Sequence, residues 1–327
     1  MSRRIASNTG LLLGAKILAT LFGIGTLLIA IRSLSPAEFG TLVFLHAYML
    51  FFAEVATFQA WQSIIRFGTD DVAANDRPSL ARLLRFGYTL DGLSVLIGYA
   101  LAVGAFGVVV ALSNRLPGLS PGEGLSVETL QTFVTFYCLV ILVRFTSTSV
   151  GIFRLFDKFT VLAVEALVQP VVRLGGVVLA AWQGWGLTGF VCVWFAGSFV
   201  QYVFLWTMGL VELRRRGLLG DVVRARINFF RPRRPIWGFV IKSNIDSTLA
   251  TGVMHLPQLL VMAIFGPVWN GVFKIAEEVA KLLTEGFKLL DQVIYPELAK
   301  LVTAGRSDRI WKIASRAAGI LLAIGLA

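Results

Sequence analysis

The chain has 327 residues, of which 56% are hydrophobic and 15% charged, and its mean hydropathy is +0.76. Soluble domains carry about a quarter charged residues, so this composition indicates an integral membrane protein and excludes a separate soluble catalytic domain. The net charge is +11, and the basic residues lie between the apolar runs, where they orient a membrane protein. Nucleic-acid binding is therefore not expected. Both cysteines lie inside apolar runs and support neither disulfides nor a cysteine metal site.

Apolar runs long enough to cross a bilayer, about 20 residues each, follow one another along the chain. We expect spans at about 10–32, 41–65, 86–112, 127–150, 160–182, 187–210, 238–265 and 271–296, and a ninth that begins near 311. Barrel strands would be half as long and would alternate in polarity. The sequence therefore predicts an all-α integral membrane protein. The first run is too long for a signal-peptide core, so we treat it as the first span.

Basic residues are divided unevenly between the two sets of loops. With the N-terminus inside, the loops on its side carry 20 Lys and Arg, whereas the opposite loops carry only Arg32 and Arg115. This asymmetry predicts a cytoplasmic N-terminus, a cytoplasmic loop at 211–237 and an external segment at Ser113–Ser126. The 211–237 loop contains eight arginines. It is expected either to lie against anionic lipid or to act only as a topological anchor.

A short internal repeat appears when the sequence is shifted by 231 residues. The shift aligns Pro36 with Pro267, Gly40 with Gly271 and Glu54 with Glu285. In each copy a span ends, a tight turn follows, and a glutamate comes about fourteen residues into the next span. Repeated transporters are built in this way. We therefore expect a six-helix bundle at 1–210, a basic cytoplasmic linker at 211–237 and a second, incomplete bundle at 238–327 that lacks about three spans.

Four short segments resemble a known transporter family. They are Asn8-Thr9-Gly10, the hairpin Ile31–Gly40, the turn Phe153–Phe159 and the segment Ile294–Ala299. They are similar to bacterial polysaccharide-repeat flippases, the O-antigen and teichoic-acid export branch of the multidrug/oligosaccharidyl-lipid/polysaccharide flippase superfamily. The resemblance covers essentially the whole chain.

This resemblance implies two six-helix bundles around a central cavity in the bacterial inner membrane. It implies that the protein flips an undecaprenyl-pyrophosphate-linked oligosaccharide by alternating access, for export of O-antigen, as in lipopolysaccharide, or of another surface polysaccharide. Contact with polysaccharide assembly proteins is an open expectation, and no cofactor is expected.

Ionisable side chains inside the spans cost about 2.5 to 3.5 kcal/mol each and therefore need a cavity or a partner. The candidate substrate-binding cations are Arg173, Arg144, Lys16, Lys242, Lys281 and Lys288. The acidic candidates for ion coupling or charge pairing are Glu54, Glu165, Asp246 and Glu285. Two histidines, His46 and His255, are too few for a metal triad, so no metal is expected.

Three spans place polar side chains along one helical face. In the fifth, Glu165, Gln169 and Arg173 lie four residues apart, with Pro170 available to open the backbone. Arg173 is expected either to contact an anion or to form a salt bridge. In the eighth, a stripe from Lys274 to Lys288 is expected to line the cavity. The face of the seventh suits either sugars or helix packing and consists of Asn244, Ser247, Thr248, Thr251, His255 and Gln258.

Two other functions compete with a flippase. Asp70-Asp71 and Asp91-Gly92 begin motifs of prenyl-chain and phosphotransferase enzymes, but neither motif is completed, so an integral-membrane transferase of lipid-linked sugars is not expected. A cation-coupled multidrug exporter of the same superfamily would need acidic cavity residues. The ionisable residues inside the spans are predominantly basic, which favours an anionic substrate.

Overall fold

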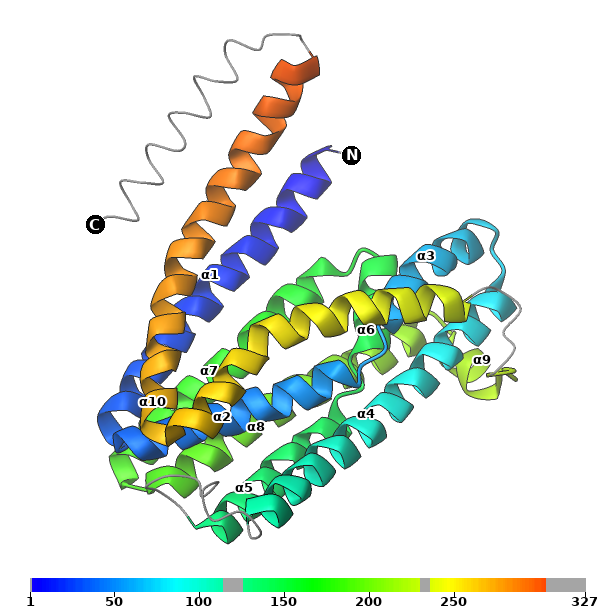
Figure 1. The fold of residues 1–327 in the computed structure, drawn as a ribbon. Helices are drawn as coiled ribbons and strands as arrows, with labels where there is room; N and C mark the ends of the chain where they lie inside the picture. The colour runs from blue at the N-terminus through cyan, green and yellow to red at the C-terminus, as the bar shows by residue number, and fades with distance from the viewer. Residues whose placement is uncertain (1, 114–125, 230–235, 304–327) are drawn as a thin grey trace. The chain divides into compact units, whose positions relative to one another are not determined.

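The structure is a computed structural model that describes residues 2–113, 126–229 and 236–303 (Figure 1). In these stretches every regular element is a helix, which confirms the expected all-α integral membrane protein. The elements are α1 Ser2–Ser33, α2 Pro36–Val55, α3 Ala60–Ala73, α4 Arg77–Ser113, α5 Val127–Cys138, η1 Leu139–Val143, α6 Ser147–Leu155, α7 Phe159–Gln183, α8 Gly186–Arg215, α9 Leu219–Arg224 and α10 Ile236–Thr303. They form two compact units, Met1–Gly271 and Val272–Ala327.

Seven stretches of the described residues are long and apolar enough to cross a membrane. They are Gly10–Ser33, Pro36–Val55, Arg77–Val108, Val127–Leu155, Phe159–Gln183, Gly186–Arg215 and Ile236–Lys281. Six of them overlap the first six expected spans, and most of their ends agree to within five residues, although the second ends ten residues earlier and the third begins nine residues earlier than expected. The expected seventh and eighth spans lie in α10 on either side of Gly266, whose non-helical backbone (φ 83°, ψ −177°) kinks the helix and separates the two. The ninth expected span lies outside the described residues.

Two expected spans are broken within their apolar runs rather than forming single continuous helices. The expected span 41–65 ends as α2 at Val55 and resumes as α3 at Ala60. The expected span 127–150 passes from α5 into a 3₁₀ turn and resumes as α6 at Ser147. Conversely, α7 runs through Pro170 without interruption, and α10 continues past residue 296, the expected end of the eighth span, to Thr303.

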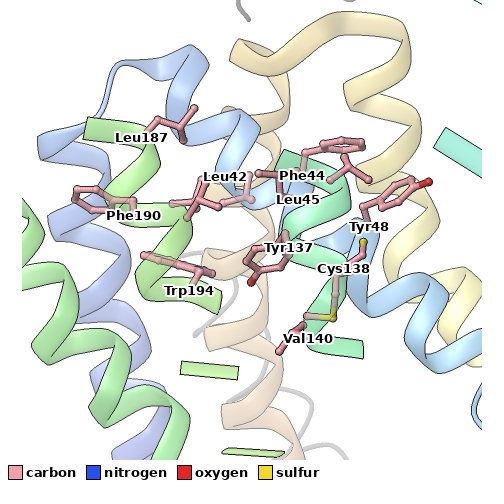
Figure 2. Close-up of a cluster of buried hydrophobic side chains, with 14 of the residues drawn as sticks. Leu42, Phe44, Leu45, Tyr48, Tyr137, Cys138, Val140, Leu187, Phe190 and Trp194 are labelled. Carbon is pink, nitrogen blue, oxygen red and sulfur yellow. The ribbon is translucent and has the colours of Figure 1, made fainter. Parts of the chain in front are cut away.

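The first unit is held by an apolar core in which α2, α5 and α8 meet (Figure 2). Leu42 and Leu45 of α2 face Phe190 and Trp194 of α8, and Tyr137 of α5 lies beside them. A second buried cluster joins α3, α4 and α6 to α9 and the start of α10. These two clusters fix the helices on both sides of the two breaks.

The repeat predicted from the sequence forms a reciprocal contact. A Cβ atom on Gly40 would lie 1.7 Å from the carbonyl oxygen of Pro267, and one on Gly271 would lie 3.3 Å from that of Pro36. Exchanging the two copies of the repeat turns the first contact into the second, as expected for a pseudo-two-fold axis between the copies. Asn270 Nδ2 also donates to Gly40 O at 2.8 Å. Glycine is required at Gly40 because the two backbones cross there without room for a side chain.

Candidate functional site

The two helix breaks are stabilised by polar side chains from neighbouring segments. Broken helices leave backbone N–H groups without partners, which in a membrane must be satisfied by protein. Ser94 Oγ of α4 accepts from Phe58 N at 3.2 Å, and Ser147 Oγ accepts from Trp61 N at 3.1 Å. Asp91, which is 2% exposed, accepts from Thr148 N at 2.9 Å. The breaks are therefore built features of the fold, as in transporters that place ligand sites at interrupted helices.

A charged cluster connects the two breaks. Arg144, directly after the 3₁₀ turn, places Nη2 3.5 Å from Glu54 Oε1 near the end of α2, and its Nη1 donates to Thr57 Oγ1 at 3.1 Å. Its guanidinium also lies 5.7 Å from the ring centre of Tyr202. Arg144 Nε is buried without a hydrogen-bond partner. The guanidinium is thus held by one long ion pair and one hydrogen bond, and its Nε donor is unused.

The same glutamate is contacted from α10. Thr251 Oγ1 donates to Glu54 Oε2 at 3.2 Å, and His255 Nε2 lies 3.7 Å from the same oxygen. Glu54 therefore lies between a cation of the α5–α6 break and two polar side chains of α10. We call Glu54, Thr57, Arg144, Thr251 and His255 the broken-helix site.

Two side chains of the polar face predicted for the seventh span form hydrogen bonds with the first break. Asn244 Nδ2 donates to Thr57 O at 2.9 Å, and Gln59 Nε2 donates to Ser247 Oγ at 2.7 Å. Gln258 is 4% exposed, and its Nε2 has no hydrogen-bond partner. The shared face is therefore confirmed, and in this structure its partners are protein groups.

Arg173 lies elsewhere, between α2, α7 and α8. Its Nη2 donates to Ser198 Oγ at 3.0 Å and lies 3.3 Å from His46 Nδ1, and its guanidinium is 5.4 Å from the ring centre of Trp194. Glu165 instead accepts from Gln201. Among the side chains that the structure describes, no salt bridge joins Glu165 to Arg173. The side chains of the predicted polar face of α7 thus form hydrogen bonds with side chains of α8.

The remaining candidates are not brought into the broken-helix site. Lys16, Lys242 and Asp246 are exposed on their helices. In the second unit, Lys274 pairs with Glu277 and Glu278 at 2.8 Å each, and Lys281 pairs with the same two carboxylates. The side chains of Glu285 and Lys288 lie outside the described residues. Within the described residues no three His, Cys, Asp or Glu side chains are grouped to hold a metal ion.

Comparison with known proteins agrees with this membrane architecture. A family model described as polysaccharide biosynthesis protein matches residues 101–309, which is more than half of the chain. The chain belongs to this family. It is also 29% identical over 327 residues to the inner membrane protein YghQ of Escherichia coli (strain K12), an alignment that covers 99% of this chain and 88% of that protein. No solved structure matches it.

Membership of the polysaccharide biosynthesis family, the inner-membrane homologue and the seven apolar stretches identify a multi-pass inner membrane protein. The flippase-type family expected from the short motifs is thereby confirmed.

Sequence reasoning missed several residues that build the broken-helix site and the two helix breaks. Asp91 was considered only as part of an enzyme motif, although an acid inside an apolar span needs a partner wherever it lies. Thr57, Gln59 and Ser94 gave no such signal, because single hydroxyls and amides are common in membrane helices.

Proposed function

We propose that this member of the polysaccharide biosynthesis family moves a lipid-linked oligosaccharide across the inner membrane, for export of O-antigen or another surface polysaccharide. The observation that supports this most strongly is the broken-helix site, where two interrupted helices and α10 bring charged, hydroxyl and amide groups together inside the membrane. In transporters, such interruptions hold substrate or coupling ions near the middle of the bilayer. The N-terminus is cytoplasmic in this proposal, as the loop charges predict.

Arg144 is the residue that meets the lipid pyrophosphate. Its guanidinium forms a 3.5 Å ion pair with Glu54, and its Nε has no hydrogen-bond partner. It can therefore form a two-pronged contact with two oxygens of a phosphate. When it does so, Glu54 keeps Thr251 and His255 as partners. A substrate that replaces Glu54 as the partner of Arg144 changes the contacts between α2 and α10. Flipping needs such a switch between two states of similar free energy.

The test uses the full chain in liposomes with a fluorescent polyprenyl-pyrophosphate oligosaccharide, whose exposure is followed with an impermeant quencher. Arg144→Met should slow flipping by about tenfold or more, and Arg144→Lys should recover only part, because an ammonium lacks the planar fork. Arg85, an exposed arginine of α4, provides the matched control Arg85→Met, which should flip normally.

The double variant Glu54→Gln with Arg144→Met separates ligand binding from folding. It removes both charges, so it should melt and accumulate like the wild type while remaining defective in flipping. Normal flipping by this variant would show that the pair is only a structural salt bridge. Transport of ethidium by the wild type, with no movement of the lipid, would favour the cation-coupled multidrug exporter instead.

A further inference from the structure

Arg173 carries a positive charge far from both ends of the membrane-spanning helices of the first unit. It lies on α7, and its neighbours His46 and Ser198 lie on α2 and α8, all three of which are long and apolar enough to cross a membrane. Each residue is nine or more residues from both ends of its helix, which is about 13 Å at 1.5 Å per residue. A cation at such a depth needs a compensating group.

Among the side chains that the structure describes, no carboxylate compensates Arg173. Its polar neighbours are Ser198 Oγ at 3.0 Å and the two ring nitrogens of His46 at 3.3 and 3.4 Å. Its guanidinium also lies 5.4 Å from the ring centre of Trp194. Glu165, two turns away on α7, accepts from a glutamine of α8 instead. Arg173 is therefore contacted only by groups without negative charge.

Hydrogen-bond donors also outnumber acceptors around Arg173. Ser198 Oγ has two lone pairs, and it accepts from Gln169 Nε2 at 2.9 Å as well as from Arg173. The ring of His46 offers at most one acceptor nitrogen, and its Nδ1 also lies 2.9 Å from the Tyr137 hydroxyl. Arg173 Nε is buried and has no hydrogen-bond partner. A group that only accepts hydrogen bonds would satisfy this surplus of donors.

The side chains around the guanidinium restrict the size of such an acceptor. Ser198 and Tyr137 are fully buried, and Trp194 is 4% exposed. On the α8 side, a Cβ atom on Gly197 would lie 2.6 Å from Arg173 Cγ, so the stem of Arg173 lies directly against the α8 backbone. One guanidinium balances one negative charge. A halide ion fits these conditions, because it is small, singly charged and accepts from any direction.

We propose that Arg173, together with its neighbours His46 and Ser198, binds a chloride ion inside the first unit. The ion neutralises the guanidinium, and its removal leaves an uncompensated charge among α2, α7 and α8, which destabilises their packing. The chloride site shares no residue with the broken-helix site and takes an inorganic ion, so it does not depend on the proposed function.

Trp194 provides a direct signal for this site. Iodide quenches indole fluorescence on contact, and dissolved iodide does not reach a ring that is 4% exposed by collision. The full chain in detergent is titrated with sodium iodide, with ionic strength held constant by gluconate. A saturable loss of fluorescence should appear beside the linear quenching of exposed rings such as Trp182, which is 83% exposed. Chloride should reverse the saturable component, and Trp194→Phe should remove it.

Substitutions of Arg173 test the source of this component. Arg173→Met should abolish it, and Arg173→Lys should raise the iodide concentration for half-saturation by about tenfold, because an ammonium lacks the planar fork. Arg154→Met is the matched control and should leave the component unchanged. Arg154 also lies over an indole, 4.2 Å from the ring centre of Trp61, but it is exposed.

Melting of the wild type gives a second measurement that does not depend on any variant folding. Chloride at about ten times its dissociation constant should raise the melting temperature by about 3–6 °C relative to gluconate at equal ionic strength. Equal melting in saturating chloride and in gluconate would overturn the proposal. A chloride effect that Arg173→Met retains would also overturn it, because the effect would then be a general influence of salt.

The fluorescence titration can overturn the proposal in three further ways. The wild type could lack a saturable component, or the component could survive Arg173→Met. Polyprenyl pyrophosphate could displace the iodide where chloride does not, which would assign the guanidinium to the lipid-linked substrate rather than to an inorganic ion.

Discussion

The crossing of the two repeat copies at Gly40 allows a sharp test of the structure. A Cβ added at Gly40 would lie 1.7 Å from Pro267 O and 2.5 Å from its carbonyl carbon. Restoring a carbon-to-oxygen contact of about 3.3 Å requires the two backbones to separate by roughly 1.6 Å. That movement would stretch the 2.8 Å bond from Asn270 Nδ2 to Gly40 O beyond hydrogen-bonding distance.

The expected cost of Gly40→Ala combines both effects. Overpacking of a tight contact costs about 1–3 kcal/mol, and a buried acceptor that loses its donor costs about 1–3 kcal/mol more. At about 2–4 °C per kcal/mol, the melting temperature should fall by at least about 4 °C. Melting can be followed by intrinsic fluorescence in detergent, since the chain has eight tryptophans.

Two variants calibrate this measurement. Gly271→Ala should cost less than Gly40→Ala, because its nearest contacts, the Phe39 side chain at 3.1 Å and Pro36 O at 3.3 Å, need to move by only a few tenths of an ångström. Gly23→Ala, where a Cβ meets nothing, should melt like the wild type or slightly above it. A Gly40→Ala protein that melts with the wild type would refute the close backbone crossing.

Two further predictions concern Arg173 and the topology. In melting experiments the stability losses of Arg173→Met and Ser198→Ala should be non-additive, since the two side chains share a 3.0 Å hydrogen bond. The stability losses of Arg173→Met and Glu165→Gln should add to within about 0.5 kcal/mol. Strong coupling between Arg173 and Glu165 would contradict the observed contacts. In a Cys192→Ser background, an impermeant maleimide should label Ser120→Cys in intact cells and Asp221→Cys only after permeabilisation. The reverse pattern would invert the proposed orientation.

The sequence by itself was sufficient to predict the spans and the membrane class. A hydrocarbon layer of fixed thickness demands apolar runs of about 20 residues, and this requirement is local, so a linear pattern records it. The polar face of α10 was predictable for the same reason, because Asn244, Thr251 and His255 recur at helical spacing. The repeat could also be found, since Pro36 and Gly40 match Pro267 and Gly271 at one constant shift.

Only the tertiary structure decided where those helices break and which charges meet. The breaks at 56–59 and 139–146 occur inside apolar runs, and they are stabilised by Asp91, Ser94 and Ser147, which come from other segments. Arg173 contacts His46 across 127 residues of sequence rather than Glu165 two turns away on its own helix. Such partners depend on which faces the packed helices turn toward each other, and neither periodicity nor composition contains that information.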